Sequence, residues 1–471
     1  MTIILVIGFY LFEKNLSSII SSNISNNNFD ISLNEVNLNF NGEISIKDFL
    51  ISNKQKDTIL YAKSFSASPS EIISYFNNEK STIKSLRFTG GFLNIHNFNS
   101  SDLSINQNGL VINQNFNTFD IQNIEFFDFN IFIKKESEKY TISNKEIKIE
   151  NLLSYNRLTQ FSITNMESKI NKREISLKSD ITINENKIKF EFENLTIGKS
   201  VFNGNIDLIN IDNIDNFKYE GYLKNSFLNS SDLNTTNANL DLEVRSIFNG
   251  DINGFSLKDL IVKSSENELK ADLFFDISKN INNSNIKLDL KNFNSSTTFL
   301  NSLYPDLFGT IIPSAFKNIG KLKIKGVLNK NGDFILSNAD IHTEFGVLDY
   351  DIKLSNLKNI NDAKYEGSFN GNNFDLAQII NLPFELQSDF KFNINGQGFD
   401  EENLKSSVVG QMNNLLINRY SYQKVFINGD VSDKLFTGSL IISDNNLDLN
   451  FDGLINYSND LVEYDFNTYI K

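Results

Sequence analysis

The sequence predicts an all-β protein: a repetitive, mainly antiparallel sheet with a few short helices. Apolar and polar residues alternate along most of the 471 residues, as where Phe390, Phe392 and Ile394 flank Lys391 and Asn393. Successive side chains of a strand point to opposite faces of its sheet, so each such tract has one apolar and one polar face. Turns rich in Asn, Asp and Gly separate the tracts, and only four prolines occur. We therefore expect more than half of the residues in strands and a very long apolar face.

Composition argues against several classes of function. The formal net charge is −14 at pH 7, and so acidic a protein repels the phosphate backbone of nucleic acids. Without cysteine, the chain can form neither disulfides nor thiolate metal sites. His96 and His342 are far apart in strand-like tracts, and carboxylates such as Asp349 and Asp351 fall on polar faces. We expect no nucleic-acid partner, no metal, no cofactor and no enzymatic activity.

Residues 1–27 are predicted to be the remnant of a membrane anchor followed by a short helix. Their apolar run is about half of the ~20 residues that a membrane-spanning helix needs, and no basic segment precedes it. A signal anchor whose basic start is missing would explain this pattern, and a buried strand is the alternative. The predicted anchor residues are Ile3, Ile4, Leu5, Val6, Ile7, Phe9, Leu11 and Phe12.

Residues 28–295 are predicted to be rich in strands. The alternation changes parity at Asn34-Glu35, which predicts a bulge or a turn at this point. Ser68-Pro69 predicts the start of a short helix near residues 70–77, since Ser caps helices and Pro suits their first turn. Gly90-Gly91 then separates two apolar tracts and predicts a hairpin.

A helical interruption is predicted at residues 296–318, where apolar residues recur at helical spacing and two prolines interrupt them. Residues 319–471 continue the strand-rich pattern. Within them we expect one short helix near residues 375–381 and a last strand near residues 464–470.

Several tracts, taken in their order, resemble a known family. The strand Asp57–Lys63 follows the strands of Ile44–Ile51, and the predicted short helix and the Ile83–Ile95 tract come next. The later tracts are Gly254–Leu260, Pro313–Gly326, Thr343–Leu348 and Phe374–Ala377. In this order they resemble the TamB-like translocation and assembly module family of the AsmA-like superfamily, in its Bacteroidota form. The resemblance covers the N-terminal portion of that family, so we expect a chain truncated at its C-terminus.

This resemblance implies an architecture, a location and a function. The strands would form a long, curved sheet that encloses an elongated apolar groove, lined by both strand-rich regions. The protein would be anchored in the inner membrane and lie mostly in the periplasm. It would carry phospholipid between the inner and outer membranes, with a β-barrel of the outer membrane as a further partner. The alternative is a periplasmic assembly factor that helps to insert outer-membrane β-barrels through strand edges.

The alternation also fits a third class of protein, and the most regular tracts provide candidate residues for the groove. A repeat structural protein or adhesin with a closed, dry core would show the same alternation, and the sequence does not distinguish groove residues from ordinary core residues. The groove candidates come from the tracts that alternate most regularly. They are Leu322, Ile324, Phe390, Phe392, Ile394, Leu447, Leu449 and Phe451.

Overall fold

The computed structural model describes residues 29–38, 43–53, 55–68, 82–96, 118–135, 138–155, 158–170, 173–211, 213–233, 239–277, 284–304, 316–317, 319–359, 361–380, 383–399, 404–432, 434–456 and 463–471. Of the described residues, 80% are in strands and 5% in helices, which confirms the predicted all-β class. The 27 strands belong to a mostly antiparallel sheet that is not closed. The chain divides into an N-terminal unit, Met1–Leu228, and a C-terminal unit, Asn229–Lys471.

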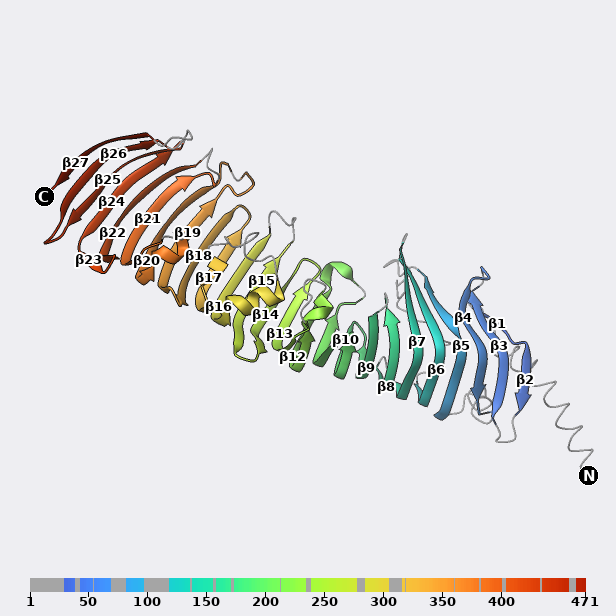
Figure 1. Ribbon diagram of the computed structural model, residues 1–471. Coiled ribbons are helices and arrows are strands. Elements are labelled where there is room, and N and C mark those ends of the chain that lie inside the picture. The colour runs from blue at the N-terminus through green and yellow to red at the C-terminus, as the bar shows by residue number, and fades with distance from the viewer. Residues whose placement is uncertain are drawn as a thin grey trace, which may run out of the picture. The chain divides into compact units, whose positions relative to one another are not determined.

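In the N-terminal unit, consecutive strands from β2 onward are antiparallel neighbours, except that β5 and β6 are parallel (Figure 1). Two short strands pair with successive parts of β3, where Ser32 lies opposite Leu50 and Glu35 opposite Lys47, so the break predicted at Asn34 is confirmed. The strands are β1 (Phe29–Ser32), β2 (Glu35–Leu38), β3 (Ile44–Asn53), β4 (Thr58–Ala67), β5 (Thr82–His96), β6 (Thr118–Lys135), β7 (Glu138–Tyr155), β8 (Leu158–Ile170), β9 (Arg173–Asn184), β10 (Lys187–Ile197), β11 (Ser200–Ile209) and β12 (Lys218–Asn229), with the 3-10 turn η1 (Ile214–Asn216) before β12.

The hairpin predicted at Gly90-Gly91 is wrong. Strand β5 continues through this dipeptide, and residues on both sides of it pair with β4, as Phe88 does with Phe65 and Leu93 with Leu60. Gly90 has a φ of 61°, a conformation that glycine adopts readily, and the pairing with β4 keeps the same register on both sides of it. The two glycines therefore lie within one continuous strand and do not reverse the chain.

In the C-terminal unit, the strands again follow one another as antiparallel neighbours. Strand β22 pairs with both β23 and β24 along its second edge. The elements are η2 (Ser230–Leu233), β13 (Asp241–Asp251), β14 (Gly254–Ser264), β15 (Asn267–Asp276), β16 (Asn285–Ser296), α3 (Thr297–Leu303), β17 (Lys321–Asn331), β18 (Phe334–Thr343), β19 (Gly346–Ser355), β20 (Lys364–Asp375), α4 (Leu376–Ile380), β21 (Leu386–Gln397), β22 (Lys405–Ile417), β23 (Tyr420–Tyr422), β24 (Val425–Ser432), β25 (Leu435–Ser443), β26 (Asp448–Asn456) and β27 (Glu463–Ile470).

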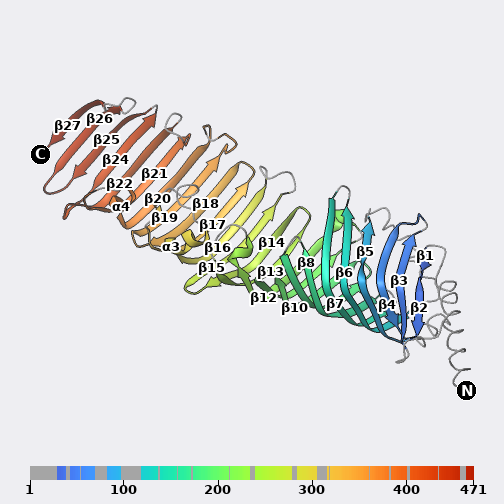
Figure 2. The same ribbon diagram turned by 45° about the vertical axis from the view of Figure 1, so that its right-hand side comes forward.

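The two short α-helices follow strands β16 and β20 directly. Ser296 caps α3, because its hydroxyl accepts the N–H of Phe299 at 3.2 Å. Figure 2 shows both helices at the same ends of the strands of the C-terminal unit. Helix α3 lies within the helical interruption predicted at residues 296–318, of which residues 305–315 and 318 lie outside the described residues. Helix α4 and strand β27 confirm the elements predicted near residues 375–381 and 464–470.

Two N-terminal predictions cannot be compared with the structure. The predicted anchor residues and the short helix near residues 70–77 lie outside the described residues. Within the described part of the chain, no helix is both long enough and apolar enough to cross a membrane.

Bulges keep apolar residues on one face along a strand. Asp259 of β14 and Asn373 of β20 have φ values of 48° and 49°, in the left-handed region that Asn and Asp tolerate better than most residues. The register of β14 shifts between Leu257 and Leu260, so both leucines stay on the same face although three positions separate them. The backbone N–H of Asp259 donates to the carboxylate of Asp272 at 2.7 Å, which holds the bulge against the next strand.

The charge of Asp272 should make this bulge sensitive to pH. The hydrogen bond from Lys291 and then the N–H of Asp259 hold the pKa of Asp272 below its usual value. A carboxyl whose pKa is lowered by folding stabilises the protein above its unfolded pKa of about 3.9 and loses this contribution as the pH falls through its folded pKa. Asp272→Asn should therefore lower the free energy of unfolding at pH 7 by no more than about 1 kcal/mol, because the carboxylate is partly exposed.

The measurement is the difference in melting temperature between wild type and Asp272→Asn from pH 7 down to pH 3. The amide keeps an oxygen for the Asp259 N–H, so the substitution removes mainly the charge. The difference should shrink on acidification and also in high salt. A difference that stays constant over this pH range would contradict the assigned role of the carboxylate.

Candidate functional site: the apolar face of the sheet

The register of the C-terminal unit aligns apolar residues in rows that cross the strands. Residues directly opposite each other on paired strands have side chains on the same face. The first row crosses 14 strands without a polar residue. Its members are Val244, Val262, Leu269, Phe293, Ile324, Ile341, Leu348, Gly371, Phe390, Met412, Val425, Ile442, Leu449 and Ile470.

Two further rows lie beside the first row on the same face, and none of the three contains a charged residue. The second row is Leu260, Ala271, Leu290, Gly326, Ala339, Tyr350, Phe369, Phe392, Gly410, Ile427, Leu440, Phe451 and Thr468. The third row is Leu257, Leu273, Leu288, Leu328, Ser337, Ile352, Gly367, Ile394, Val408, Gly429, Gly438, Gly453 and Phe466. We call these three rows the apolar face.

The structure brings the groove candidates from the sequence together on this face. Ile324, Phe390 and Leu449 belong to the first row. Phe392 and Phe451 belong to the second row and Ile394 to the third, as listed above. Leu322 lies two residues before Ile324 on β17 and so points to the same face. Leu447 precedes β26 and packs with Leu449 against one buried cluster of the unit.

Burial varies along the first row. Phe390, Val425 and Ile442 are less than a tenth exposed, and Val425 is only 1% exposed. The ring of Phe390 packs edge-on against Phe374 at 5.9 Å between centroids. Ile324 and most other members of the row are only partly buried, and Ile470 of β27 is exposed. The apolar face is therefore part core and part solvent-accessible surface.

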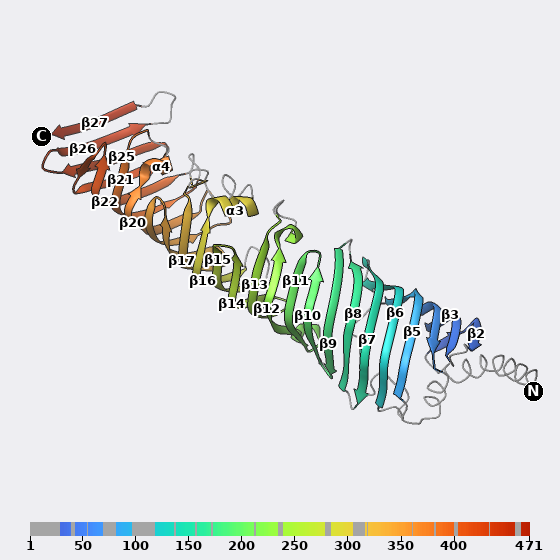
Figure 3. The ribbon, with the colours of Figure 1, turned by 60° about the horizontal axis from the view of Figure 1, so that its bottom comes forward.

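No second sheet covers this face among the described elements of the C-terminal unit. The extensive contacts of each strand are with the neighbours to which it is hydrogen-bonded, and the helices contact only β16 and β21 extensively. Figure 3 shows α3 and α4 beside the strands of this unit. In ordinary soluble domains, a second layer buries the apolar face of a sheet, so an uncovered apolar face of this extent indicates a binding surface.

The N-terminal unit has an apolar face of the same kind. One row crosses β2 to β8 and consists of Val36, Ile46, Phe65, Phe88, Phe126, Ile147 and Met166. The rings of Phe65, Phe88 and Phe126 are in series, with centroids 4.9 Å apart at each step. Near this row, Asn144 is a buried polar residue that donates to the backbone oxygen of Phe129 at 2.9 Å.

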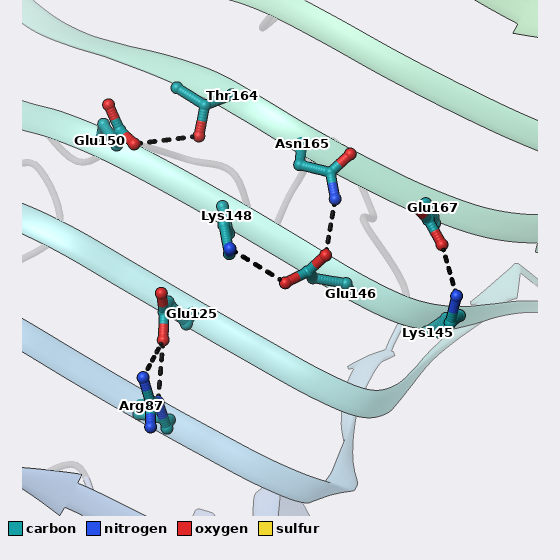
Figure 4. A network of polar contacts seen from close by, with 9 residues as sticks. All are labelled: Arg87, Glu125, Lys145, Glu146, Lys148, Glu150, Thr164, Asn165 and Glu167. Carbon is teal, nitrogen blue, oxygen red and sulfur yellow. Dashed lines mark hydrogen bonds and ion pairs between the residues drawn. The ribbon is translucent and has the colours of Figure 1, made fainter.

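The opposite face of the N-terminal unit is charged, and its charges pair with one another (Figure 4). Arg87 forms an ion pair with Glu125 at 2.7 Å across β5 and β6. Glu146 contacts Lys148 at 3.2 Å and accepts a hydrogen bond from Asn165 at 2.6 Å. The hydrogen bond from Lys148 lowers the pKa of Glu146 from its ordinary value. Such paired surface charges keep this face in water and add little to stability.

The polar face of the C-terminal unit contains the histidine whose side chain the structure describes. His342 Nε2 lies 2.9 Å from Asp340 Oδ1, but both side chains are about half exposed, so this pair is not a buried catalytic site. The side chain of His96 lies outside the described residues. A hollow of about 570 Å³ also opens on this face and is lined mostly by polar residues of β19 to β22, including Asp351, Glu366 and Asn393.

The sequence analysis missed the residues that make the apolar face continuous. Met412, Val425 and Ile442 join Phe390 to Leu449 in the first row, and Gly371 and Gly410 lie opposite Phe390 and Phe392. The period-2 pattern places each of them on the apolar side of its own strand, but only the register shows which residues are neighbours.

Comparison of the chain with protein-family models, with curated proteins and with solved structures gave no match.

Proposed function

We propose that this protein carries phospholipid along its apolar face, as part of an envelope-spanning scaffold for lipid transfer. The observation that supports the proposal most is the set of three charge-free rows, which cross the strands from β13 or β14 to β27. No second layer covers them among the described elements. A hydrocarbon chain needs an apolar surface without charges and makes no directional demands on it.

The free energy of lipid transfer explains why a continuous apolar surface is useful. Each methylene group that leaves an apolar environment for water costs about 0.8 kcal/mol. A phospholipid with roughly 30 methylene groups therefore faces a cost of about 24 kcal/mol in water. A row of apolar side chains that is interrupted nowhere reduces this cost at every point of the path.

The length of the face also suits this role. Neighbouring strands lie about 4.8 Å apart, so a row across 14 strands is roughly 60 Å long. One acyl chain spans about half of a hydrocarbon core that is ~30 Å thick. The first row could therefore accommodate several lipid molecules one after another, which is what a conduit requires and a single-ligand pocket does not.

The cellular part of the proposal rests on the sequence resemblance described above. We propose that the protein lies in the cell envelope, anchored in the inner membrane at its N-terminus and mostly periplasmic. The phospholipid would move between the inner and outer membranes, with an outer-membrane β-barrel as a partner. The apolar face would then be the wall of the curved groove that the resemblance implies.

Lipid that copurifies with the protein tests this proposal most directly. The chain would be purified in detergent-free buffer, extracted with organic solvent and analysed by mass spectrometry. We expect at least about one phospholipid per chain, because the exposed part of the face is costly to leave in contact with water. Protein that is folded, monomeric and free of lipid, even after incubation with phospholipid vesicles, would contradict the proposal. Such a result would leave the strand-edge assembly factor as the better hypothesis.

A further inference from the structure

Glycines on the apolar face are covered by aromatic rings from neighbouring strands. A Cβ atom placed on Gly371 would meet only ring atoms of Phe390 at closest range, and one placed on Gly429 would meet the ring of Phe436 first. The ring of Phe392 is likewise the group nearest to a Cβ on Gly410. The ring of Tyr365 lies beside Gly396, which is two residues after Ile394 on β21.

The register places several of these glycines next to one another. Gly429, Gly438 and Gly453 are consecutive members of the third row on β24, β25 and β26. The ring of Phe436 approaches the first two of them, so it lies along the sheet and does not stand upright. The rings of Phe390 and Phe392 are stacked with centroids 4.9 Å apart and planes inclined by 24°.

An aromatic ring that lies over a glycine keeps the surface apolar but low. In a packed sandwich, two sheets lie about 10 Å apart, so upright side chains fill roughly 5 Å above each sheet. Where glycine removes the side chain and a ring covers the backbone, part of this height stays free. Positions on the same face recur every two residues, so a lane one residue wide measures about 7 Å, which suits one hydrocarbon chain.

We propose that these glycines and the rings beside them form a low lane in which an extended acyl chain lies against the sheet. The lane crosses β20 to β26 obliquely, from Gly371 in the first row through Gly410 in the second to Gly429, Gly438 and Gly453 in the third. This inference rests on the proposed lipid-carrying function and assigns particular residues to it. The occupant is hydrocarbon because the three rows contain no charge that a headgroup, an anionic ligand or a peptide could pair with. Covering glycine with aromatic rings also stabilises strands. The test must therefore distinguish the effect of a raised side chain on lipid binding from its effect on the stability of the protein.

Gly429→Val tests the lane. Valine favours strands, and the closest backbone atom to a Cβ at this position is the oxygen of Thr437 at 3.3 Å, so the new side chain mainly displaces the ring of Phe436. The raised ring should obstruct the lane in a protein that is still folded. We expect the phospholipid retained after incubation with phosphatidylethanolamine–phosphatidylglycerol vesicles to fall about tenfold, as measured by native mass spectrometry.

Two companion variants distinguish obstruction from a general defect. Gly429→Val combined with Phe436→Ala removes the displaced ring and should restore retention to within about twofold of wild type, since a twofold change corresponds to only ~0.4 kcal/mol. Ser439→Val adds the same side chain to the opposite face of β25, where Ser439 lies opposite Asn428 and Asp452, and should leave retention unchanged. If Gly429→Val does not fold, Gly371→Ala replaces it, because its Cβ meets only the ring of Phe390 at closest range.

The outcomes separate the lane from the proposed function. If the wild type retains lipid and a folded Gly429→Val or Gly371→Ala variant retains equally much, the lane is overturned and the proposed function is left intact. Wild type that retains no lipid overturns the proposed function and the lane with it. A lipid-free dimer in the native mass spectrum would show that a second copy covers the apolar face, and this also overturns the lane.

Discussion

Replacing Phe392 with Asp should abolish lipid retention while the protein stays folded. Phe392 lies in the middle of the second row, between Phe369 and Gly410, and its side chain is only partly buried. Since no described layer covers the face, the carboxylate can reach water and avoids the cost of a buried charge. The lost ring contacts should destabilise the protein by about 1–2 kcal/mol. The charge, however, interrupts the apolar path and should reduce bound phospholipid to background.

The measurements are circular dichroism, thermal unfolding and lipid extraction. Asn393→Asp is the matched control, because it adds the same charge one residue further along, on the polar face. This control should keep its lipid and its melting temperature. If Phe392→Asp unfolds the protein, the second row is closed core at this position. If the variant folds and keeps its lipid, the lipid path lies elsewhere.

Replacing Val425 with Asp should unfold the C-terminal unit or come close to doing so. Val425 belongs to the first row on the same face but is 1% exposed, where it packs with Leu415 and Ile442. A carboxylate at this position has neither water nor a cationic partner, and an uncompensated buried charge costs about 3–5 kcal/mol. Because whole domains are stable by only about 5–15 kcal/mol, this loss is a large part of the total.

Phe426→Asp is the control for this prediction. Phe426 is the next residue of β24, lies on the opposite face and is 44% exposed, so its substitution should change the free energy of unfolding by less than about 1 kcal/mol. Urea unfolding of both variants measures the difference. Equal stability of Val425→Asp and wild type would show that the first row is open to water even where it is most buried, contrary to the structure.

Local sequence determined the strands and the face on which each residue lies. Between bulges, a side chain's face depends only on whether its position in the strand is odd or even, and the parity change at Asn34 is visible in the residues themselves. The role of glycine was harder to recognise. At Gly90, the two glycines fit both a hairpin and a continuous strand, and only the pairing of Phe88 and Leu93 with one neighbouring strand distinguishes the two.

The tertiary structure alone decided which residues are neighbours across the sheet and what covers them. Phe390 and Val425 look equivalent in the sequence to Phe392 and Ile394, yet the first two are buried and the others are only partly buried. The physical reason is that register and layering involve residues far apart in the chain, whereas alternation involves only adjacent ones. The sequence by itself therefore determined that a long apolar face exists, and the fold decided that its rows are continuous, free of charge and partly uncovered.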